Sequence, residues 1–323
     1  MNYNVVYGIN LVGFNLNKEK LMSQENIRTL DLLFQGKKKA IASYAILSSH
    51  GVILIESGPG STLESLKTEL NTIGYELKDI TDVLLTHIHL DHAGAAGKLA
   101  ALGANIHVHP LGARHLTDPT KLISSATRIY AERMNKLWGE ILPVPEDKLR
   151  IFKDGENFNI GSKQFRTIFT PGHAEHHACI LFDGICFSGD VGAIRIPGYR
   201  YIRIPMPPPE LDLSKWIESL KIIKQLKPDA IAPTHFGIYV DVDEHLNKAI
   251  ETISEIKKWI NKHFMKTLDH EILKLEFNDW MNGQARAENL SVEVIESFAL
   301  SNPLDMSVDG MIRYWTKILH PQN

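Results

Sequence analysis

Four side chains that can bind a metal ion lie within six positions of one turn of the chain. The segment Thr86-His-Ile-His-Leu-Asp-His-Ala-Gly94 follows an apolar stretch and contains His87, His89, Asp91 and His92. Neutral imidazoles and carboxylates hold borderline divalent ions, and His87 and His89, two positions apart, can converge from an extended turn. Asp91 and His92 point elsewhere and could serve a second ion. One turn cannot complete two metal sites, so this hypothesis requires further ligands later in the chain.

Three more candidate ligands follow later segments that are expected to be strands. His173 ends Phe169-Thr-Pro-Gly-His, Asp190 ends Phe187-Ser-Gly-Asp and His235 ends Ile231-Ala-Pro-Thr-His. Loops at the ends of strands held in a rigid sheet are common places for functional side chains. The total of five histidines and two aspartates is enough for two neighbouring ions.

With these residues in this order, the sequence resembles the metallo-β-lactamase-fold superfamily over roughly residues 40 to 240. Its signature is a T-H-x-H-x-D-H turn followed by G-H, G-D and a final H, and every station is present. The resemblance implies that His87, His89 and His173 bind one metal ion. It further implies that Asp91, His92 and His235 bind the other, with Asp190 bridging the two. The implied fold is a four-layer αβ/βα sandwich of the α+β class, with the C-terminal helices as an extension.

Two further motifs are most similar to the glyoxalase-II-like branch of this superfamily. They are Thr170-Pro-Gly-His-Ala-Glu-His-His177 and Gly189-Asp-Val-Gly192. The chain departs from that branch at Glu56, where an aspartate is usual, so the carboxylate expected to orient a ligand histidine is one methylene longer. The glycine-rich element after the bridging aspartate is replaced by residues 193–209, which argues against glutathione thioesters as substrates.

The resemblance implies a hydrolase with two divalent metal ions, with zinc as the first expectation and iron or manganese as alternatives. Such a pair lowers the pKa of a shared water to near neutrality, and the hydroxide would attack the carbonyl of a small ester, thioester or lactone. Asp91 is expected to orient the nucleophile and manage its proton, with Asp190 bridging. One alternative is a mononuclear iron oxidoreductase of the persulfide dioxygenase kind, which the second set of ligands opposes. Another is a phosphodiesterase or nuclease of the same fold.

Composition favours a globular enzyme that acts on a small molecule. Hydrophobic residues make up 44% of the 323 residues and charged residues 23%, which excludes disordered and collagen-like chains. The formal net charge is −3, whereas a nucleic-acid binder is expected to carry an excess of basic residues. No long apolar stretch predicts a membrane span. Cys179 and Cys186 are expected to be buried free thiols, which fits the cytoplasm.

The chain is expected to divide into a catalytic domain over residues 1–242 and a helical C-terminal extension over 243–323. Strands are predicted at Val5–Val12, at Ile27–Phe34 and in two later runs, each followed by helices. One helix is expected to begin at Ser61 as N-cap with Glu64 completing a capping box, and another to run from Leu122 to Leu137. Tryptophans in the helical tail are expected to pack or to form a homodimer contact.

The remaining histidines and one basic loop have structural interpretations. His107 and His109 alternate along a predicted strand, and one of His176 and His177 is expected to face the site while the other packs. The loop residues Tyr199, Arg200, Tyr201 and Arg203 are expected to be solvated rather than to bind an anion. His115 is expected to make a loop contact, with a position in the wall of the pocket as the alternative. Surface positions are predicted for His245, His263, His270 and His320.

Overall fold

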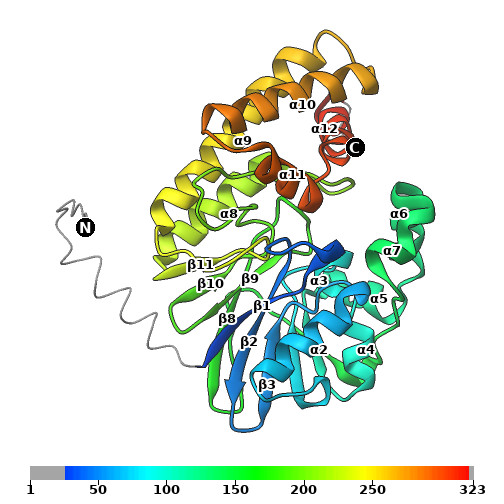
Figure 1. Ribbon diagram of the computed structural model, residues 1–323, viewed down its shortest axis with the longest axis vertical. Helices are drawn as coiled ribbons and strands as arrows, with labels where there is room; N and C mark the ends of the chain where they lie inside the picture. Colours follow the sequence, from blue (N-terminus) through cyan, green and yellow to red (C-terminus); the bar gives the residue numbers. More distant parts are fainter. Residues whose placement is uncertain (1–25, 320–323) are drawn as a thin grey trace, which may run out of the picture.

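The computed structural model describes residues 26–319 and contains two mixed β-sheets between layers of helices (Figure 1). The first sheet has the order β1-β2-β3-β4-β5-β6. Its strands are β1 (Ile27–Asp31), β2 (Ala42–Ser48), β3 (Gly51–Ile55), β4 (Ile80–Leu84), β5 (Asn105–Val108) and β6 (Leu149–Ile151). The second sheet has the order β11-β10-β9-β8-β7. Its strands are β7 (Asn157–Ile160), β8 (Lys163–Phe169), β9 (Ala178–Phe182), β10 (Ile185–Phe187) and β11 (Ala230–Ala232).

Helices cover the outer face of each sheet. Those that follow strands of the first sheet are α2 (Leu63–Thr72), α3 (Leu90–Ala93), α4 (Ala96–Ala101), α5 (Pro110–Thr117), α6 (Thr120–Tyr130) and α7 (Met134–Trp138). Those on the side of the second sheet are α8 (Leu213–Leu226), α9 (Val242–Phe264), α10 (His270–Ala287), α11 (Val292–Ser301) and α12 (Leu304–Leu319). Together the layers form the expected αβ/βα sandwich with C-terminal helices, which confirms the predicted fold class.

Alternating side chains in the central strands build the two neighbouring cores. In β3, Ile53 and Ile55 pack between the two sheets, whereas Val52 and Leu54 pack against the helices of the first half. Successive side chains of a strand point to opposite faces, so a strand buried on both sides is apolar along its whole length. The core between the sheets joins β3 to side chains such as Phe165 of the second sheet.

Strand direction brings the candidate ligands to one edge of the sandwich. In the first sheet, β3, β4 and β5 are parallel to one another. In the second sheet, β9 is antiparallel to both of its neighbours, β8 and β10, and β11 is parallel to β10. The carboxyl ends of β8, β10 and β11 therefore share an edge. Because parallel strands deliver the loops that follow them to the same edge, residues far apart in sequence meet there.

The C-terminal helices share a core with the second half of the sandwich. Trp216 of α8, Ile253 of α9, Phe277 of α10 and Met311 of α12 belong to one buried cluster. The same cluster contains Cys186 of β10, so the core of these helices is continuous with that of the sheet that carries candidate ligands.

Several local predictions were wrong. Ser61 is not an N-cap: its Oγ donates to the Leu137 carbonyl oxygen at 2.5 Å, and α2 begins at Leu63 after a 3-10 turn. The predicted helix 122–137 is interrupted by a 3-10 turn that starts at Ala131, whose φ is 45°. The strand expected at Ile27–Phe34 ends at Asp31.

Two predictions fall on residues that the structure does not describe. The strand expected at Val5–Val12 and the surface position of His320 lie outside residues 26–319.

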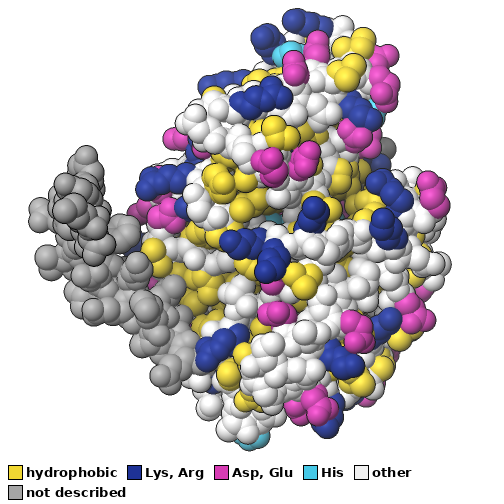
Figure 2. All heavy atoms as spheres, viewed as in Figure 1, with side chains coloured by type: hydrophobic (Ala, Val, Ile, Leu, Met, Phe, Trp, Pro, Cys, Tyr) yellow, Lys and Arg dark blue, Asp and Glu magenta, His cyan; other side chains and the backbone are white. Residues whose placement is uncertain are grey.

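Among the described residues, no helix is both long and apolar enough to cross a membrane. Basic and acidic side chains are intermixed over the face shown in Figure 2.

The N-terminus of α8 provides a test of the fold next to the site. Asp212 Oδ1 accepts the backbone N–H groups of Ser214 at 2.9 Å and Lys215 at 3.1 Å. Asp212→Ala removes this cap, so we expect the free energy of unfolding to fall by about 1 kcal/mol in urea denaturation. Asp212→Asn keeps an acceptor and is expected to lose less. Equal losses in the two variants would contradict the capping role.

Candidate metal centre

The turn after β4 carries four of the candidate ligands into the space between the sheets. His87 and His92 are fully buried, and His89 is the residue that precedes α3. The backbone of this turn is fixed by the loop after β3, because the His92 carbonyl oxygen accepts the N–H of Ser57 at 2.8 Å and of Gly58 at 3.1 Å.

The other three candidate ligands come from loops of the second sheet, and two are oriented by backbone carbonyls. His173 Nδ1 lies 3.0 Å from the Pro205 oxygen, and His235 Nδ1 lies 2.8 Å from the Ala40 oxygen. A carbonyl oxygen can only accept, so both rings carry a proton on Nδ1 and, when neutral, present the Nε2 lone pair to the site. The Ala40 oxygen also accepts the Ser301 hydroxyl at 3.2 Å.

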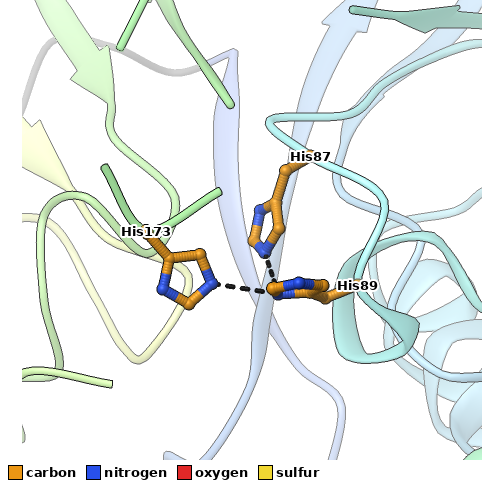
Figure 3. Close-up of side chains that lie close together, drawn as sticks. All are labelled: His87, His89 and His173. Atoms are coloured by element: carbon orange, nitrogen blue, oxygen red, sulfur yellow. Dashed lines mark hydrogen bonds between the residues drawn. The ribbon is translucent and has the colours of Figure 1, made fainter. Parts of the chain in front are cut away.

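His87, His89 and His173 form the first group of ligand atoms (Figure 3). His89 Nδ1 lies 2.9 Å from His87 Nε2 and 2.9 Å from His173 Nε2. All three nitrogens lie within 4.8 Å of one another. Three imidazoles that converge from two different sheets match the ligand chemistry of a zinc-like ion.

Asp91, His92, Asp190 and His235 form the second group of ligand atoms, also within 4.8 Å of one another. His92 Nε2 lies 3.1 Å from Asp190 Oδ1, and His235 Nε2 lies 3.4 Å from both Asp190 Oδ1 and Asp91 Oδ2. Three of these buried atoms, His92 Nε2, His235 Nε2 and Asp190 Oδ1, form no hydrogen bond within the described part of the chain. Buried polar atoms that lack partners are costly, and a metal ion would satisfy all three.

Asp190 contacts both groups through different oxygens. Its Oδ1 faces His92 and His235 of the second group, while its Oδ2 lies 3.2 Å from His173 Nε2 of the first group. A carboxylate placed in this way can coordinate two neighbouring ions at once.

The electrostatic environment differs between the two groups. Burial lowers the pKa of His89 to about 3 and also lowers the pKa values of His87 and His173. These imidazoles are therefore neutral, as metal binding requires. Burial opposes charge on His92, but the Asp190 and Asp91 carboxylates raise its pKa well above the usual value.

Glu56 supports the site from behind the second group. Its Oε1 accepts from His92 Nδ1 at 2.9 Å and from the hydroxyls of Thr86 and Thr234. The sequence predicted a carboxylate here that orients a ligand histidine, and the structure identifies that histidine as His92. The backbone at Glu56 is left-handed, with a φ of 64°.

A cavity of about 610 Å³ opens above the two groups. Its floor includes His89, Asp91, His173, Asp190 and His235. Its walls come from α5, α6 and α7 on one side and from residues 299–306 on the other, with the proline-rich loop 205–209 between them. These walls were not predicted from the sequence. Apolar residues at positions 122, 126, 129 and 130 of α6 have the spacing of one helix face and could have indicated the wall that α6 forms.

His176 and His177 have different environments, as the sequence predicted. His176 lines the cavity, with Nε2 3.6 Å from Glu210 Oε2. His177 is fully buried and packs away from it, with Nδ1 2.8 Å from the Thr170 hydroxyl. His115, expected in a loop contact, is in α5 and lines the cavity.

Several other histidines have structural partners. His107 Nε2 lies 2.8 Å from Asp82, and His109 caps α5 by accepting from the Leu111 N–H. The surface prediction for His245 was wrong, because that ring is buried and its Nε2 lies 2.7 Å from the Gly192 oxygen. His263 is only partly exposed and stacks on Trp259.

The loop after Asp190 is also more buried than predicted. Tyr201 and Arg203 are buried rather than solvated, and the Arg203 guanidinium lies 5.4 Å from the Phe298 ring centroid. Arg200 pairs with Glu244 on α9. None of these side chains lines the cavity above the metal ligands.

Comparisons with known proteins agree with this geometry. Residues 37–235 match the family model of the metallo-β-lactamase superfamily. The chain is 28% identical over 213 residues to a metallo-β-lactamase fold-containing protein of Sulfurisphaera tokodaii, covering 64% of this chain and 77% of that protein. It is 25% identical over 202 residues to an atrochrysone carboxyl ACP thioesterase of Aspergillus fumigatus, covering 62% of this chain and 51% of that protein.

A third relative is a hydroxyacylglutathione hydrolase of Francisella tularensis, 26% identical over 45% of this chain and 47% of that enzyme. The chain thus spans about half the length of the last two relatives. Among solved structures, a metallo-β-lactamase family protein of Thermus thermophilus superimposes with a TM-score of 0.62 at 19% identity, covering 91% of this chain and 94% of that one. This fold similarity extends into the C-terminal helices.

The fold, the His/Asp cluster and the family match define a class of protein. The chain belongs to the metallo-β-lactamase superfamily, whose members are generally hydrolases, and its cluster is consistent with metal binding.

Metal binding can be tested by removing one imidazole of the first group. After dialysis against zinc, we expect the His89→Ala variant to contain less bound metal than the wild-type protein, because only two of the three converging nitrogens remain. At a zinc concentration about 100-fold above the dissociation constant, the wild-type protein should gain about 2.7 kcal/mol of stability in thermal denaturation. His50→Ala, at an exposed position, is the matched control. Unchanged metal content in His89→Ala would contradict the assignment.

Proposed function

We propose that this protein is a dinuclear metal-dependent hydrolase that adds water to the carbonyl carbon of an ester, thioester or lactone. The observation that carries the proposal is the position of Asp190 between two separate groups of ligand atoms. In this proposal His87, His89 and His173 hold one divalent ion, zinc in the first instance. Asp91, His92 and His235 hold the other, and Asp190 bridges them.

Two divalent ions bound in this way would supply a water of near-neutral pKa and a Lewis acid for the carbonyl oxygen. The chain's own residues keep the donor atoms fixed. The carbonyls of Pro205 and Ala40 hold two imidazole rings in one tautomer, and Glu56 holds a third ring through His92 Nδ1. Ligands fixed before substrate arrives do not have to reorganise during the reaction.

Asp91 is the residue best placed to hold the proton of the attacking water. Its carboxylate is 19% exposed, whereas that of Asp190 is 4% exposed, and it lines the floor of the cavity. Burial opposes its charge, but His92 and His235 lower the pKa of Asp91 to about 2, so it is anionic and can accept a hydrogen bond from water. The proton held at Asp91 would then pass to the departing oxygen or sulfur.

The relatives support carbonyl hydrolysis as the class of reaction. Two of them are named as a thioesterase and a hydroxyacylglutathione hydrolase, and both names describe cleavage of a thioester. The partly open cavity of about 610 Å³ suits a small-molecule substrate. The free, buried thiols of Cys179 and Cys186 support a reducing compartment, which we take to be the cytoplasm.

Catalysis by Asp91 predicts a specific kinetic defect. We expect Asp91→Asn to lower kcat on a thioester by about 100-fold to 10,000-fold, because the amide cannot take up a proton. Metal content should be measured on the same samples to separate this effect from loss of an ion. Asp279→Asn, an exposed carboxylate on α10, is the matched control.

A substrate panel of thioesters, lactones and phosphodiesters distinguishes the alternatives. The proposal requires two metal ions per chain and turnover on a carbonyl substrate. Turnover confined to phosphodiesters would favour a nuclease-like enzyme, and one iron per chain with oxygen consumption would favour a mononuclear oxidoreductase.

A further inference from the structure

The cavity above the metal ligands is large and mainly apolar at its walls. Its volume of about 610 Å³ lies within the range of about 300–1,000 Å³ for pockets that enclose a small organic ligand. The wall from α6 and α7 presents Leu122, Ala126, Ile129 and Leu137, and the opposite wall presents Leu300 and Met306. An acetyl or lactoyl group would leave most of this space unfilled.

The two walls meet through a direct contact. The Tyr130 hydroxyl on α6 donates to the Met306 sulfur on α12 at 3.3 Å, so two helices far apart in the sequence contact each other in the cavity wall. Leu111 and Ile129 line this space yet remain 52% and 38% exposed. Large apolar side chains exposed in a concave surface are typical of a binding site for an apolar group.

The side of the cavity formed by α5 and α6 also carries cations. Arg114, Lys121 and Arg133 line the cavity and are solvent-exposed, and none of them forms an ion pair within residues 26–319. Figure 2 shows basic side chains on the α6–α7 side of the molecule, with apolar side chains beside them.

The carboxylates that line the cavity form no ion pair with these cations. Asp91 and Asp190 belong to the proposed metal site, and Glu210 Oε2 lies 3.6 Å from His176 Nε2 and accepts the Glu175 N–H at 3.0 Å. Exposed guanidinium and ammonium groups at the mouth of an apolar cavity favour a ligand with an anionic end.

We propose that the substrate is an amphipathic acyl ester or thioester, with an apolar acyl chain in the cavity between α6–α7 and residues 299–306 and an anionic leaving portion at Arg114, Lys121 and Arg133. This inference rests on the proposed hydrolytic function. The orientation follows from the exposure of the side chains: Arg114, Lys121 and Arg133 are exposed to solvent, which a bulky leaving portion must reach. The acyl chain gains most from the apolar side chains that are buried or partly buried, namely Leu122, Ala126, Leu137, Leu300 and Met306.

For a thioester the reaction is balanced by water alone. The oxygen of water bonds to the carbonyl carbon, the carbon–sulfur bond breaks, and one proton of water passes to the departing sulfur. The other proton stays on the new carboxylic acid and is released to solvent when the acid ionises, so the products are a fatty or other apolar carboxylate, a proton, and a thiol that keeps the anionic groups of the leaving portion.

Acyl-chain selectivity tests the apolar part of the proposal. With the metal-loaded protein, we expect kcat/KM for octanoyl-coenzyme A to exceed that for acetyl-coenzyme A by at least about 100-fold, because the added methylenes leave water. Ser125→Trp places an indole into the cavity from α6 and should reduce this octanoyl-to-acetyl ratio at least about 10-fold. Ser124→Trp, the exposed neighbour outside the cavity, should leave the ratio unchanged.

Charge reversal tests the anionic part. Lys121→Glu combined with Arg133→Glu should raise KM for octanoyl-coenzyme A by about 10-fold, and added salt should weaken wild-type binding. The uncharged thioester octanoyl-N-acetylcysteamine should show neither effect. Arg128→Glu, exposed on α6 but outside the cavity, is the matched control.

The outcomes separate this inference from the function on which it depends. Hydrolysis of acetyl and octanoyl thioesters at equal kcat/KM would overturn the substrate assignment and leave the hydrolase intact. Equal KM changes for charged and uncharged thioesters in the charge-reversal variant would overturn the cationic role. Absence of turnover on every ester, thioester and lactone would overturn the proposed function itself.

Discussion

The position of one carboxylate relates the two halves of the molecule to each other. Asp190 follows β10 of the second sheet, yet one of its oxygens faces His92 from the first sheet and the other faces His173 from the second. Such an arrangement tolerates little displacement of one sheet against the other. The core between the sheets, which includes Ile53 and Phe165, therefore serves the site as well as the stability of the fold.

The loops that hold these side chains are fixed by contacts with backbone groups of other loops. The His92 carbonyl is bound by the loop after β3, and the rings of His173 and His235 are bound by the carbonyls of Pro205 and Ala40. The first two contacts lie within one half of the molecule, whereas that of His235 with Ala40 joins the two halves, so this ring is oriented only when both halves are in place. Rigid sheets thus give short loops the precision that metal binding needs.

The fold class and the seven candidate site residues could be read from the sequence because their signals are local. The turn from His87 to His92 is one short segment, and the later residues each follow an apolar run. Signals of this kind depend on spacing along the chain, which the sequence contains in full.

What the sequence did not contain were contacts between distant segments. His245 was expected at the surface because it lies in the helical tail, but it is buried and its Nε2 lies 2.7 Å from the Gly192 oxygen. Arg203 was expected in a solvated loop, whereas α11 packs Phe298 over its guanidinium. The cavity walls likewise join residues 110–138 to residues 299–306, and no periodicity in either segment specifies its partner. The prediction of Ser61 as an N-cap was wrong for the same reason, since its hydroxyl donates to the distant Leu137 carbonyl oxygen.

The Ala40 carbonyl oxygen has two donors, and they belong to different parts of the protein. One is His235 Nδ1 in the proposed metal site, and the other is the Ser301 hydroxyl at the end of α11, where the cavity wall begins. A bound molecule that displaces α11 would therefore change the hydrogen bonding of the oxygen that orients His235. The cavity wall and the ring of His235 therefore share a single acceptor atom.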